Sequence, residues 1–303
     1  MRVLITGGAG FIGSHIVDAH IEKGDDVLII DNLSTGFEEN INKKASFEKI
    51  DIIDDLHNIF ESFRPQIVNH HAAQINVRRS EKDPIYDARN NIIGTINLLL
   101  LAKKYQVEHF IFASSGGTVY GEAEILPTAE DYHLNPLSPY GCSKVAGEFY
   151  IRSLLKDSGI KYTVLRYGNI YGPRQNPLSE AGVIVIFITS ILKGEVCTIF
   201  GDGEQTRDYL HVYDCVAANL LALDHPPGIY NIGTGIETSV NQLIEILKEI
   251  VGRDFEYQHG PPRPEEIRKS CLDWKRAREV LNWRPRTSLR SGIAETYRYY
   301  SSI

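Results

Sequence analysis

Short apolar runs alternate with longer stretches of helical periodicity along the first half of the chain. The apolar runs have the length of buried strands. We expect strands at Val3–Thr6, Asp26–Ile30, Phe47–Ile50, Ile67–His70, His109–Ala113 and Tyr162–Tyr167. We expect helices at Ile12–Lys23, Asp54–Phe63, Tyr86–Tyr105 and Pro139–Ser158. This alternation predicts an α/β fold, in which a doubly wound (Rossmann) parallel sheet carries helices on both faces.

The pattern changes after Tyr167, where glycines and prolines interrupt the alternation. This change predicts a second, smaller α/β lobe that packs against the first, with a cleft between them. We expect the first lobe to span residues 1–168 and the second, which would bind the substrate, to span residues 169–303. The strongly apolar segment 208–232 could return to the first lobe, so the boundary stays open.

A glycine-rich turn, TGGAGFIG, joins the first expected strand to the first expected helix. Gly7, Gly10 and Gly13 would let the backbone approach a pyrophosphate, which the free N–H groups at the start of the helix would bind. Asp31 closes the next strand, where a carboxylate accepts both ribose hydroxyls of adenosine and repels a 2′-phosphate. The pattern predicts a dinucleotide site that prefers NAD to NADP. A turn without a ligand is the alternative, and the strand, turn and helix around the glycines argue against it.

Tyr140 and Lys144 are four residues apart in the stretch SPYGCSKVAGEF and would share one helix face. A phenol is a poor base at neutral pH, but a nearby ammonium and a cationic nicotinamide are expected to lower its pKa. Tyr140 could then take a proton from an alcohol while hydride leaves for NAD. In isolation such a pair is usually a packing and surface feature. Its position downstream of a dinucleotide motif favours the catalytic interpretation.

A hydroxyl-rich loop, FASSGGTVYG, follows the fifth expected strand. Ser114, Ser115 and Thr118 would lie at the carboxyl end of that strand, where one hydroxyl could bridge the substrate and Tyr140. Hydroxyls that only satisfy the turn are an equally good explanation for each residue taken singly.

The amino-acid composition limits the classes of partner that we expect this protein to bind. The 303 residues carry a net charge of -7, which gives no basic face for nucleic acid. The four cysteines are widely spaced, with no CxxC, so we expect buried thiols in a reducing compartment, no disulfide framework and no metal site. No apolar run reaches the ~18 residues of a membrane helix, and the first strand leaves no room for a signal peptide. We therefore expect a cytoplasmic protein with no membrane partner.

TGGAGFIG, Asp31-Asn32, Tyr140-xxx-Lys144 and LRYGNIYGP together resemble the extended short-chain dehydrogenase/reductase family, and the resemblance covers essentially the whole chain. It implies that Tyr140 is the catalytic base and that Lys144 binds the nicotinamide ribose. The implied NAD site comprises Gly7, Gly10, Phe11, Ile12, Gly13, Asp31, Asn32, Asp51, Ile52, Ala72, Asn91, Tyr140, Lys144 and Tyr167. The implied UDP-sugar site comprises Asn169, Arg207, Arg263 and Ser270.

The resemblance also implies a reaction. It is closest to members that invert carbon 4 of a UDP-hexose through a transient 4-keto sugar, so UDP-glucose and UDP-galactose are the expected substrates. Ser270 is small where similar enzymes limit space at the sugar's 2-substituent, which favours activity on UDP-GlcNAc and UDP-GalNAc as well. Members of the family pair the helices that correspond to residues 86–105 and 139–158, which predicts a homodimer. The apolar stripes of these helices are also explained by core packing; they include Ile92, Ile96, Leu99, Val145 and Phe149.

Two departures from the family pattern bear on the site. The hydroxyl loop is one residue longer than usual, so counting from Phe112 puts Ser115 in the catalytic serine's place, whereas counting back from Tyr120 puts Gly116 there. We expect Ser115 to act, with Thr118 as a second hydroxyl. The segment PPRPEEIRKS also places Glu265 and Glu266 close to Arg263, which makes the local charge less favourable for phosphate.

Two other functions stay open. The family's 4,6-dehydratases carry an Asp-Glu pair in the hydroxyl loop, where this chain has Gly117 and Thr118, so a nucleotide-sugar 4,6-dehydratase is the weaker enzymatic alternative. A catalytically silent NAD-binding regulator is the other, because a fold alone does not establish chemistry.

Overall fold

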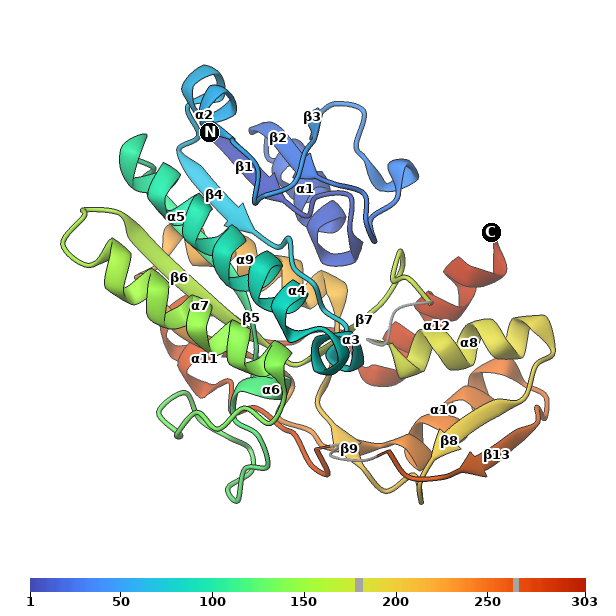
Figure 1. Cartoon of the computed structure of the whole chain (residues 1–303). Coiled ribbons are helices and arrows are strands. Elements are labelled where there is room, and N and C mark those ends of the chain that lie inside the picture. Colours follow the sequence, from blue (N-terminus) through green and yellow to red (C-terminus); the bar gives the residue numbers. More distant parts are fainter. Residues whose placement is uncertain (178–181, 264–266) are drawn as a thin grey trace.

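The larger lobe is built on a seven-stranded sheet in which all paired strands are parallel (Figure 1). The computed structural model describes residues 1–177, 182–263 and 267–303. The strand order is β11-β6-β5-β4-β1-β2-β3. The strands are β1 (Arg2–Thr6), β2 (Asp26–Asp31), β3 (Ser46–Lys49), β4 (Ile67–His70), β5 (His109–Ser115), β6 (Lys161–Tyr167) and β11 (Gly228–Ile232). The predicted doubly wound α/β fold is confirmed, and the six predicted strands agree with the observed ones to within two residues at each end.

Helices cover both faces of this sheet (Figure 1). The core on one face is shared by α2 (His57–Phe63), α5 (Gly94–Lys104) and α7 (Pro139–Leu155). The core on the other face is shared by α1 (Phe11–Glu22), α9 (Val212–Asp224) and α11 (Lys275–Leu281). Leu99 of α5 is fully buried, so it belongs to the core.

The segment expected to be a single helix over 86–105 contains three helical elements instead. The short helix α4 (Pro84–Ala88) begins after Asp83, whose side chain accepts a hydrogen bond from the backbone N–H of Tyr86. The π-helical turn η2 (Arg89–Ile93) follows, and α5 continues from Gly94. A π turn adds a residue per turn and shifts the faces of a helix, and such turns are frequent at functional sites.

The smaller lobe packs helices against short strands at the other end of the molecule (Figure 1). Its core is shared by α8 (Val183–Lys193), α10 (Val240–Val251), α12 (Leu289–Ser301) and the strand β8 (Cys197–Phe200), which pairs in parallel with β13 (Tyr257–Gly260). Two further pairs join β7 (Asn169–Tyr171) to β10 (Tyr209–His211) and β9 (Thr206–Arg207) to β12 (Thr238–Ser239). The remaining short helices are η1 (Glu38–Asn40), α3 (Val77–Lys82) and α6 (Gly116–Val119).

The apolar segment 208–232 crosses between the lobes. Its helix α9 packs against α1, and its strand β11 extends the large sheet beside β6. Farther along the chain, α11 packs against β11 and α9, and Trp283 is buried in the same core. Residues 169–303 therefore do not form one continuous unit in space, because β11 extends the large sheet and α9 and α11 pack on one of its faces.

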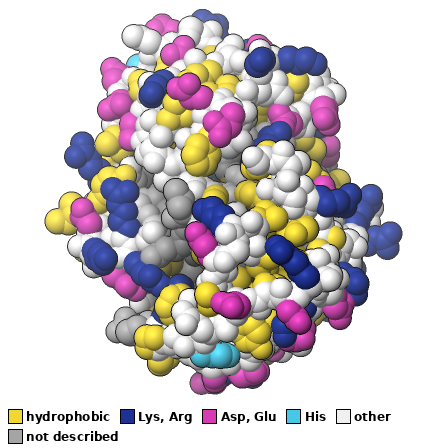
Figure 2. Space-filling view, turned by 90° about the vertical axis from the view of Figure 1, so that its right-hand side faces the viewer, with side chains coloured by type: hydrophobic (Ala, Val, Ile, Leu, Met, Phe, Trp, Pro, Cys, Tyr) yellow, Lys and Arg dark blue, Asp and Glu magenta, His cyan; other side chains and the backbone are white. Residues whose placement is uncertain are grey.

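Surface features and thiols complete the description. Within the described ranges, every helix is too short or too polar to cross a membrane. On the face seen in Figure 2, Lys and Arg side chains are interspersed with Asp and Glu side chains.

All four cysteines are free, but the expectation that all four are buried is wrong for Cys142, which is exposed on α7. The described residues contain no cluster of three or more His, Cys, Asp or Glu side chains of the kind that holds a metal.

Candidate active site

The glycine turn lies between β1 and α1 and is shaped by close backbone contacts. Gly7 has a φ of +71°, and a Cβ there would come within 2.7 Å of the Ala72 backbone nitrogen. A Cβ on Gly13 would come within 2.1 Å of the Gly7 carbonyl oxygen. Gly10 is the N-cap of α1 and has no side chain to cap the helix. The first N–H groups of α1, including those of Phe11 and Ile12, are therefore available to bind an anion.

An acidic and amide cluster lies at the ends of β2 and β3, beside this turn. The Asp31 carboxylate accepts hydrogen bonds from the backbone N–H groups of Ala9 and Leu33, at 3.0 and 2.8 Å. Burial raises the pKa of Asp31, and both hydrogen bonds oppose that shift. Asn32 donates to the Asp51 carboxylate at 2.7 Å. The sequence predicts a carboxylate at the end of β2, and the two backbone hydrogen bonds to Asp31 fix its orientation beside the glycine turn.

Tyr140 and Lys144 lie on α7, as their spacing predicts. Ser138 caps the helix, and the Tyr140 backbone N–H donates to the Ser80 hydroxyl at 3.1 Å. The Lys144 ammonium donates to the Ala113 carbonyl at 2.9 Å and lies 5.7 Å from the centre of the Tyr140 ring. The pair is therefore fixed against the carboxyl end of β5 and against α3.

The electrostatics of this pair differ from the sequence-based expectation. Burial raises the pKa of Tyr140, and Lys144 is not among the groups that lower it. A hydrogen bond from Ser115 lowers the pKa of Tyr140, and the Asp87 charge raises it. Burial also lowers the pKa of Lys144 to about 8. The expected lowering of the Tyr140 pKa, which depends on Lys144 together with a bound nicotinamide, is not seen in the protein without NAD, because removal of the phenolate from water dominates there.

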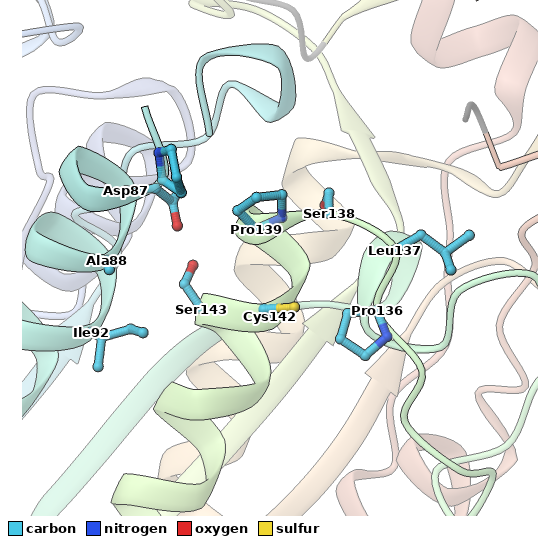
Figure 3. Close-up of a pocket in the computed structure, with 10 residues that line it drawn as sticks. Asp87, Ala88, Ile92, Pro136, Leu137, Ser138, Pro139, Cys142 and Ser143 are labelled. Atoms are coloured by element: carbon cyan, nitrogen blue, oxygen red, sulfur yellow. The ribbon is translucent and has the colours of Figure 1, made fainter. Parts of the chain in front are cut away.

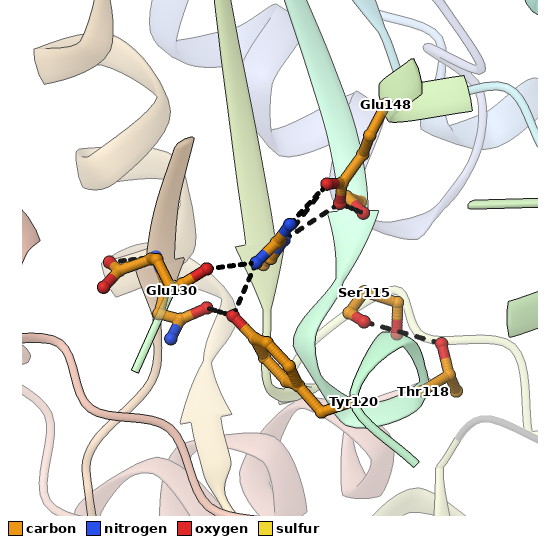
Figure 4. A network of polar contacts seen from close by, with 8 residues as sticks. Ser115, Thr118, Tyr120, Glu130 and Glu148 are labelled. Carbon is orange, nitrogen blue, oxygen red and sulfur yellow. Dashed lines mark hydrogen bonds and ion pairs between the residues drawn. The ribbon is translucent and has the colours of Figure 1, made fainter. Parts of the chain in front are cut away.

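The hydroxyl loop after β5 presents Ser115 to Tyr140. Ser115 ends β5 and is hydrogen-bonded to the Tyr140 phenol, whereas Gly116 begins α6 and is buried. Thr118 lines the same cleft and has a long contact of 3.5 Å to the Ser115 carbonyl (Figure 4). Between the two ways of counting along the loop, the geometry favours Ser115 as the hydroxyl beside the phenol.

A buried network beneath this loop ties its strands to α7 (Figure 4). Arg166 on β6 forms an ion pair with Glu148 on α7 at 2.6 Å and donates to the Tyr120 hydroxyl at 2.8 Å. Ser114, next to Ser115, also donates to Glu148. Tyr120 in turn donates to Asn231 on β11 at 2.7 Å. The network fixes the end of β5 relative to α7, and a buried pair held this way is destabilised strongly when one partner is removed.

The glycine turn, the acidic cluster and the tyrosine–lysine pair open into one cleft of about 990 Å³ between the lobes. The predicted residues that line it are Gly7, Gly10, Phe11, Ile12, Gly13, Asp31, Asn32, Asp51, Ile52, Ala72, Ser115, Thr118, Tyr140, Lys144, Tyr167, Asn169, Arg207 and Arg263. The structure therefore brings together side chains from the ends of six strands of the large sheet and from the smaller lobe.

The smaller lobe supplies an apolar wall with two guanidinium groups. Phe187 and Phe200 line this side of the cleft, and the Arg263 guanidinium lies 4.1 Å from the centre of the Phe200 ring. Arg207 donates to the Thr206 carbonyl at 2.8 Å. Glu265 and Glu266, which were expected to weaken the site for phosphate, lie outside the described residues.

Two predicted site residues do not line the cleft. Asn91 is buried on the π turn, where its amide donates to Asp87 and to the Ser143 hydroxyl at 3.0 and 3.1 Å. Ser270 is buried with its N–H donating to the Thr206 carbonyl at 3.2 Å. Asn91 therefore supports the walls of the cleft, and Ser270 lies behind Arg207.

Sequence reasoning missed most of the loop after β4. His71 lines the cleft and stacks on Tyr167, with 6.2 Å between ring centres. Burial lowers the pKa of His71 to about 3, with a smaller effect from Lys144. Gln74 lines the cleft as well. The position of this loop could have indicated its role, because the stretch HHAAQ lies at the carboxyl end of a predicted parallel strand, where ligands bind in such sheets.

Comparisons with known proteins place these features in context. A model of the NAD dependent epimerase/dehydratase family matches residues 3–233. The structure of a UDP-glucose 4-epimerase from Thermotoga maritima, solved with UDP-glucose, is 49% identical, with a TM-score of 0.98, and the match covers 100% of this chain and 99% of that one. The NAD complex of a UDP-glucose 4-epimerase from Thermus thermophilus is 41% identical, with a TM-score of 0.95, over 99% of both chains. A UDP-N-acetylglucosamine 4-epimerase from Methanobrevibacter ruminantium, in complex with UDP-N-acetylmuramic acid, is 36% identical, with a TM-score of 0.94, over 99% of this chain and 98% of that one.

Proposed function

The chain belongs to the NAD dependent epimerase/dehydratase family, and from this we propose that it inverts carbon 4 of a UDP-hexose with NAD as its cofactor. The observation that carries the proposal is the single cleft in which Tyr140, Lys144 and Ser115 meet the glycine turn. An epimerase of this kind needs a base, a dinucleotide and a sugar within one enclosed space. UDP-glucose and UDP-galactose are the proposed substrates.

The residues of the glycine turn fit NAD. A Cβ at Gly7 or Gly13 would overlap neighbouring backbone, so only glycine allows the turn to pack this closely against the start of α1. The uncapped start of α1 offers N–H groups to a pyrophosphate. Asp31 would accept the ribose hydroxyls at the lone pairs that its two backbone donors leave open. When bound, NAD supplies the hydride acceptor and donor that oxidation and reduction at carbon 4 require, and it adds a positive charge to the cleft.

Tyr140 is the proposed acid and base. Its phenolate would take the proton from the hydroxyl on carbon 4 and would return it to the same oxygen after the sugar has turned over. Ser115 would donate a hydrogen bond that stabilises the phenolate. Burial lowers the pKa of Lys144 to about 8, and its ammonium would contribute positive charge while it holds the ribose.

Turnover of the sugar requires a firm grip on the nucleotide and a loose grip on the hexose. Arg207 and Arg263 are proposed to bind the diphosphate, because a guanidinium matches phosphate oxygens in bidentate geometry. Asn169 lies next to Gly117 in the hydroxyl loop and is proposed to contact the sugar nucleotide. Binding energy would thus be concentrated away from the reacting carbon.

The proposal is tested with the purified protein, NAD and UDP-galactose, followed by the anomeric proton signals in NMR spectra. The UDP-glucose signals should grow until the two sugars reach a fixed ratio, and the same ratio should be reached when UDP-glucose is the starting sugar. Signals of a 6-deoxy-4-keto sugar would instead identify a dehydratase. An unchanged spectrum, with NAD binding detected by calorimetry, would identify a silent NAD-binding protein.

The assembly proposed for this chain is a homodimer through α5 and α7. Large apolar side chains are exposed on α5, on α7 and on the adjoining turn η2, among them Leu100, Phe149 and Ile93. Light scattering after size exclusion should give twice the chain mass. Phe149→Glu should give the monomer mass, whereas Ile236→Glu, a matched exposed position on the smaller lobe, should leave the dimer intact. A dimer that Phe149→Glu does not weaken would place the interface elsewhere.

We further propose a cytoplasmic location, because four free thiols are typical of a reducing compartment. Fractionation of cells that express a tagged chain would test this.

A further inference from the structure

A buried carboxylate lies behind the tyrosine–lysine pair, and the proposed reaction does not yet use it. Asp87 on α4 is 1% exposed. It borders a second cavity, of about 410 Å³, between α4 and the start of α7, where it faces Ser143 across the cavity (Figure 3). A carboxylate excluded from water in this way must be held by hydrogen bonds and by opposite charge.

A chain of hydrogen bonds connects Asp87 to Tyr140. Asp87 accepts from the side-chain amides of Gln74 and Asn91, at 2.9 and 3.0 Å. The Asn91 amide also donates to Ser143 at 3.1 Å, and the Ser143 hydroxyl donates to the Tyr140 carbonyl at 2.9 Å. The π turn at 89–93 carries Asn91 in the middle of this chain. Gln74 itself lines the main cleft, so Asp87 contacts a residue of the cleft wall directly.

On the premise of the proposed epimerase function, we propose that Asp87 is a positioning residue that acts through Lys144 and Tyr140. Its carboxylate holds Asn91 and Gln74 against α7 and balances the charge of the Lys144 ammonium.

The charges around Lys144 support this role. Burial lowers the pKa of Lys144, and the Asp87 charge opposes that shift more than any other group, followed by Glu148. The same Asp87 charge raises the pKa of Tyr140. The titratable groups that face Lys144 are Asp87, Glu148, Tyr140, His70 and His71. Burial and Lys144 lower the pKa of both histidines, so neither adds positive charge near neutral pH.

The direction of the effect on activity follows from the two roles. Activity requires a deprotonated Tyr140 and a protonated Lys144. Activity therefore rises with pH as Tyr140 loses its proton and falls as Lys144 loses its proton. Removal of the Asp87 charge would lower the pKa of both groups. Both limbs of the pH profile would therefore move to lower pH, by about one unit. A purely structural defect would lower the profile without moving its limbs.

Asp87→Asn removes the charge and keeps an oxygen that can accept from Gln74 and Asn91. We expect both limbs of its kcat/KM profile to shift to lower pH. Ser143→Ala breaks the hydrogen-bond chain and keeps the charge, so its activity should fall with the limbs in place. Asp26→Asn removes an exposed carboxylate at the far end of β2 and should leave the profile unchanged.

A second readout does not depend on activity. Lys144 can be titrated by NMR in protein with ¹³C-labelled lysine, its Cε signal being identified by its absence from Lys144→Arg. Asp87→Asn should lower the measured pKa of Lys144 by about one unit.

An unchanged pKa of Lys144, or a pH profile whose limbs do not move, would overturn the proposal. If Asp87→Asn does not fold, Asp87→Glu serves as the second variant, because it keeps the charge. Its pH profile must then keep both limbs at the wild-type positions, and a shift of either limb would overturn the proposal. A wild-type protein that fails to convert UDP-galactose would refute the proposed function, while the lysine titration would still judge Asp87.

Discussion

At the scale of single residues, the phenol of Tyr140 carries the proposed chemistry. Tyr140→Phe removes the proton acceptor and leaves the ring, which lies beside the Lys144 ammonium. We predict that epimerisation of UDP-galactose falls by about 10²- to 10⁴-fold, the usual contribution of a positioned acid and base. NAD affinity, measured by calorimetry, should change only a few-fold.

The matched control is Tyr150→Phe, a tyrosine exposed on the same helix. It should keep wild-type activity. Full activity of the Tyr140→Phe protein would show that another group moves the proton.

We propose that Ser270, which the family resemblance places near the sugar's 2-substituent, influences whether an acetylated sugar fits. The segment that contains it pairs with Thr206, next to Arg207 in the cleft wall, so Ser270 lies just behind that wall. We predict that Ser270→Tyr, which adds a ring that the buried site cannot hold, lowers activity on UDP-GalNAc by about ten-fold or more and that on UDP-galactose by about three-fold or less. Ser270→Ala should keep both activities. Equal losses on the two substrates would mean that the side chain does not select the sugar.

Sequence reasoning found residues whose partners are close in the chain, and residues that end predicted parallel strands, such as Asp31 and Ser115. Gly7 and Gly13 share one turn, and Tyr140 and Lys144 share one helix turn, so spacing alone predicts their contact. Asp87 could not be found in this way, because its effect on α7 depends on packing between α4 and α7. The direction of the Tyr140 pKa shift was also missed, since burial of the phenol can only be known from the folded chain.

At the scale of elements, the first turn of α1 must touch the glycine turn for the cofactor site to form. The Cβ of an alanine at Gly13 would overlap the Gly7 carbonyl at 2.1 Å, and backbone cannot move aside as a flexible side chain can. We predict that Gly13→Ala lowers the free energy of unfolding by about 3 kcal/mol and abolishes NAD binding. Urea denaturation and calorimetry would measure the two effects.

Gly24→Ala separates this overlap from the general effect of losing a glycine. Gly24 has a φ of +84°, but a Cβ there would meet nothing within 4 Å. It should therefore lose only about 1 kcal/mol, through backbone strain, and keep NAD binding. Equal losses in the two variants would mean that the contact with Gly7 is unimportant.

Periodicity identified most elements of the large lobe and missed one irregularity. The apolar positions over 86–105 continue through the π turn, so the sequence predicts a single helix where α4, η2 and α5 follow one another. The strand β11 shows the other limit. The sequence marks 208–232 only as an apolar segment that could return to the first lobe, and pairing with β6 assigns β11 to the large sheet. We propose that α9 and β11 be counted with the NAD-binding lobe, together with residues 1–168.

At the scale of the whole molecule, buried histidines couple folding to pH. Burial lowers the pKa of His15 and His109 to about 4 and that of His71 to about 3, and these residues lie in different parts of the large lobe. Each is neutral in the folded protein at pH values where an unfolded histidine, with its pKa near 6.5, takes up a proton. The unfolded chain therefore binds more protons below pH 6.5, and the folded state loses stability as the pH falls from 6.5 towards 4.

Each such histidine lowers the free energy of unfolding by up to about 1.4 kcal/mol per pH unit in that window, so the three together give roughly 4 kcal/mol per unit. Since a domain is stable by only about 5–15 kcal/mol, we predict cooperative acid unfolding near pH 5. His109→Gln, whose amide can keep the 2.9 Å contact to the Thr163 hydroxyl, should reduce the slope of stability against pH by less than a third, because burial also lowers the pKa of His20, His70 and His211. His133→Gln, at an exposed position, should leave it unchanged. Urea titrations from pH 7.5 to 5 measure this slope, and a stability that stays constant over that range would mean that the buried histidines take up protons without unfolding.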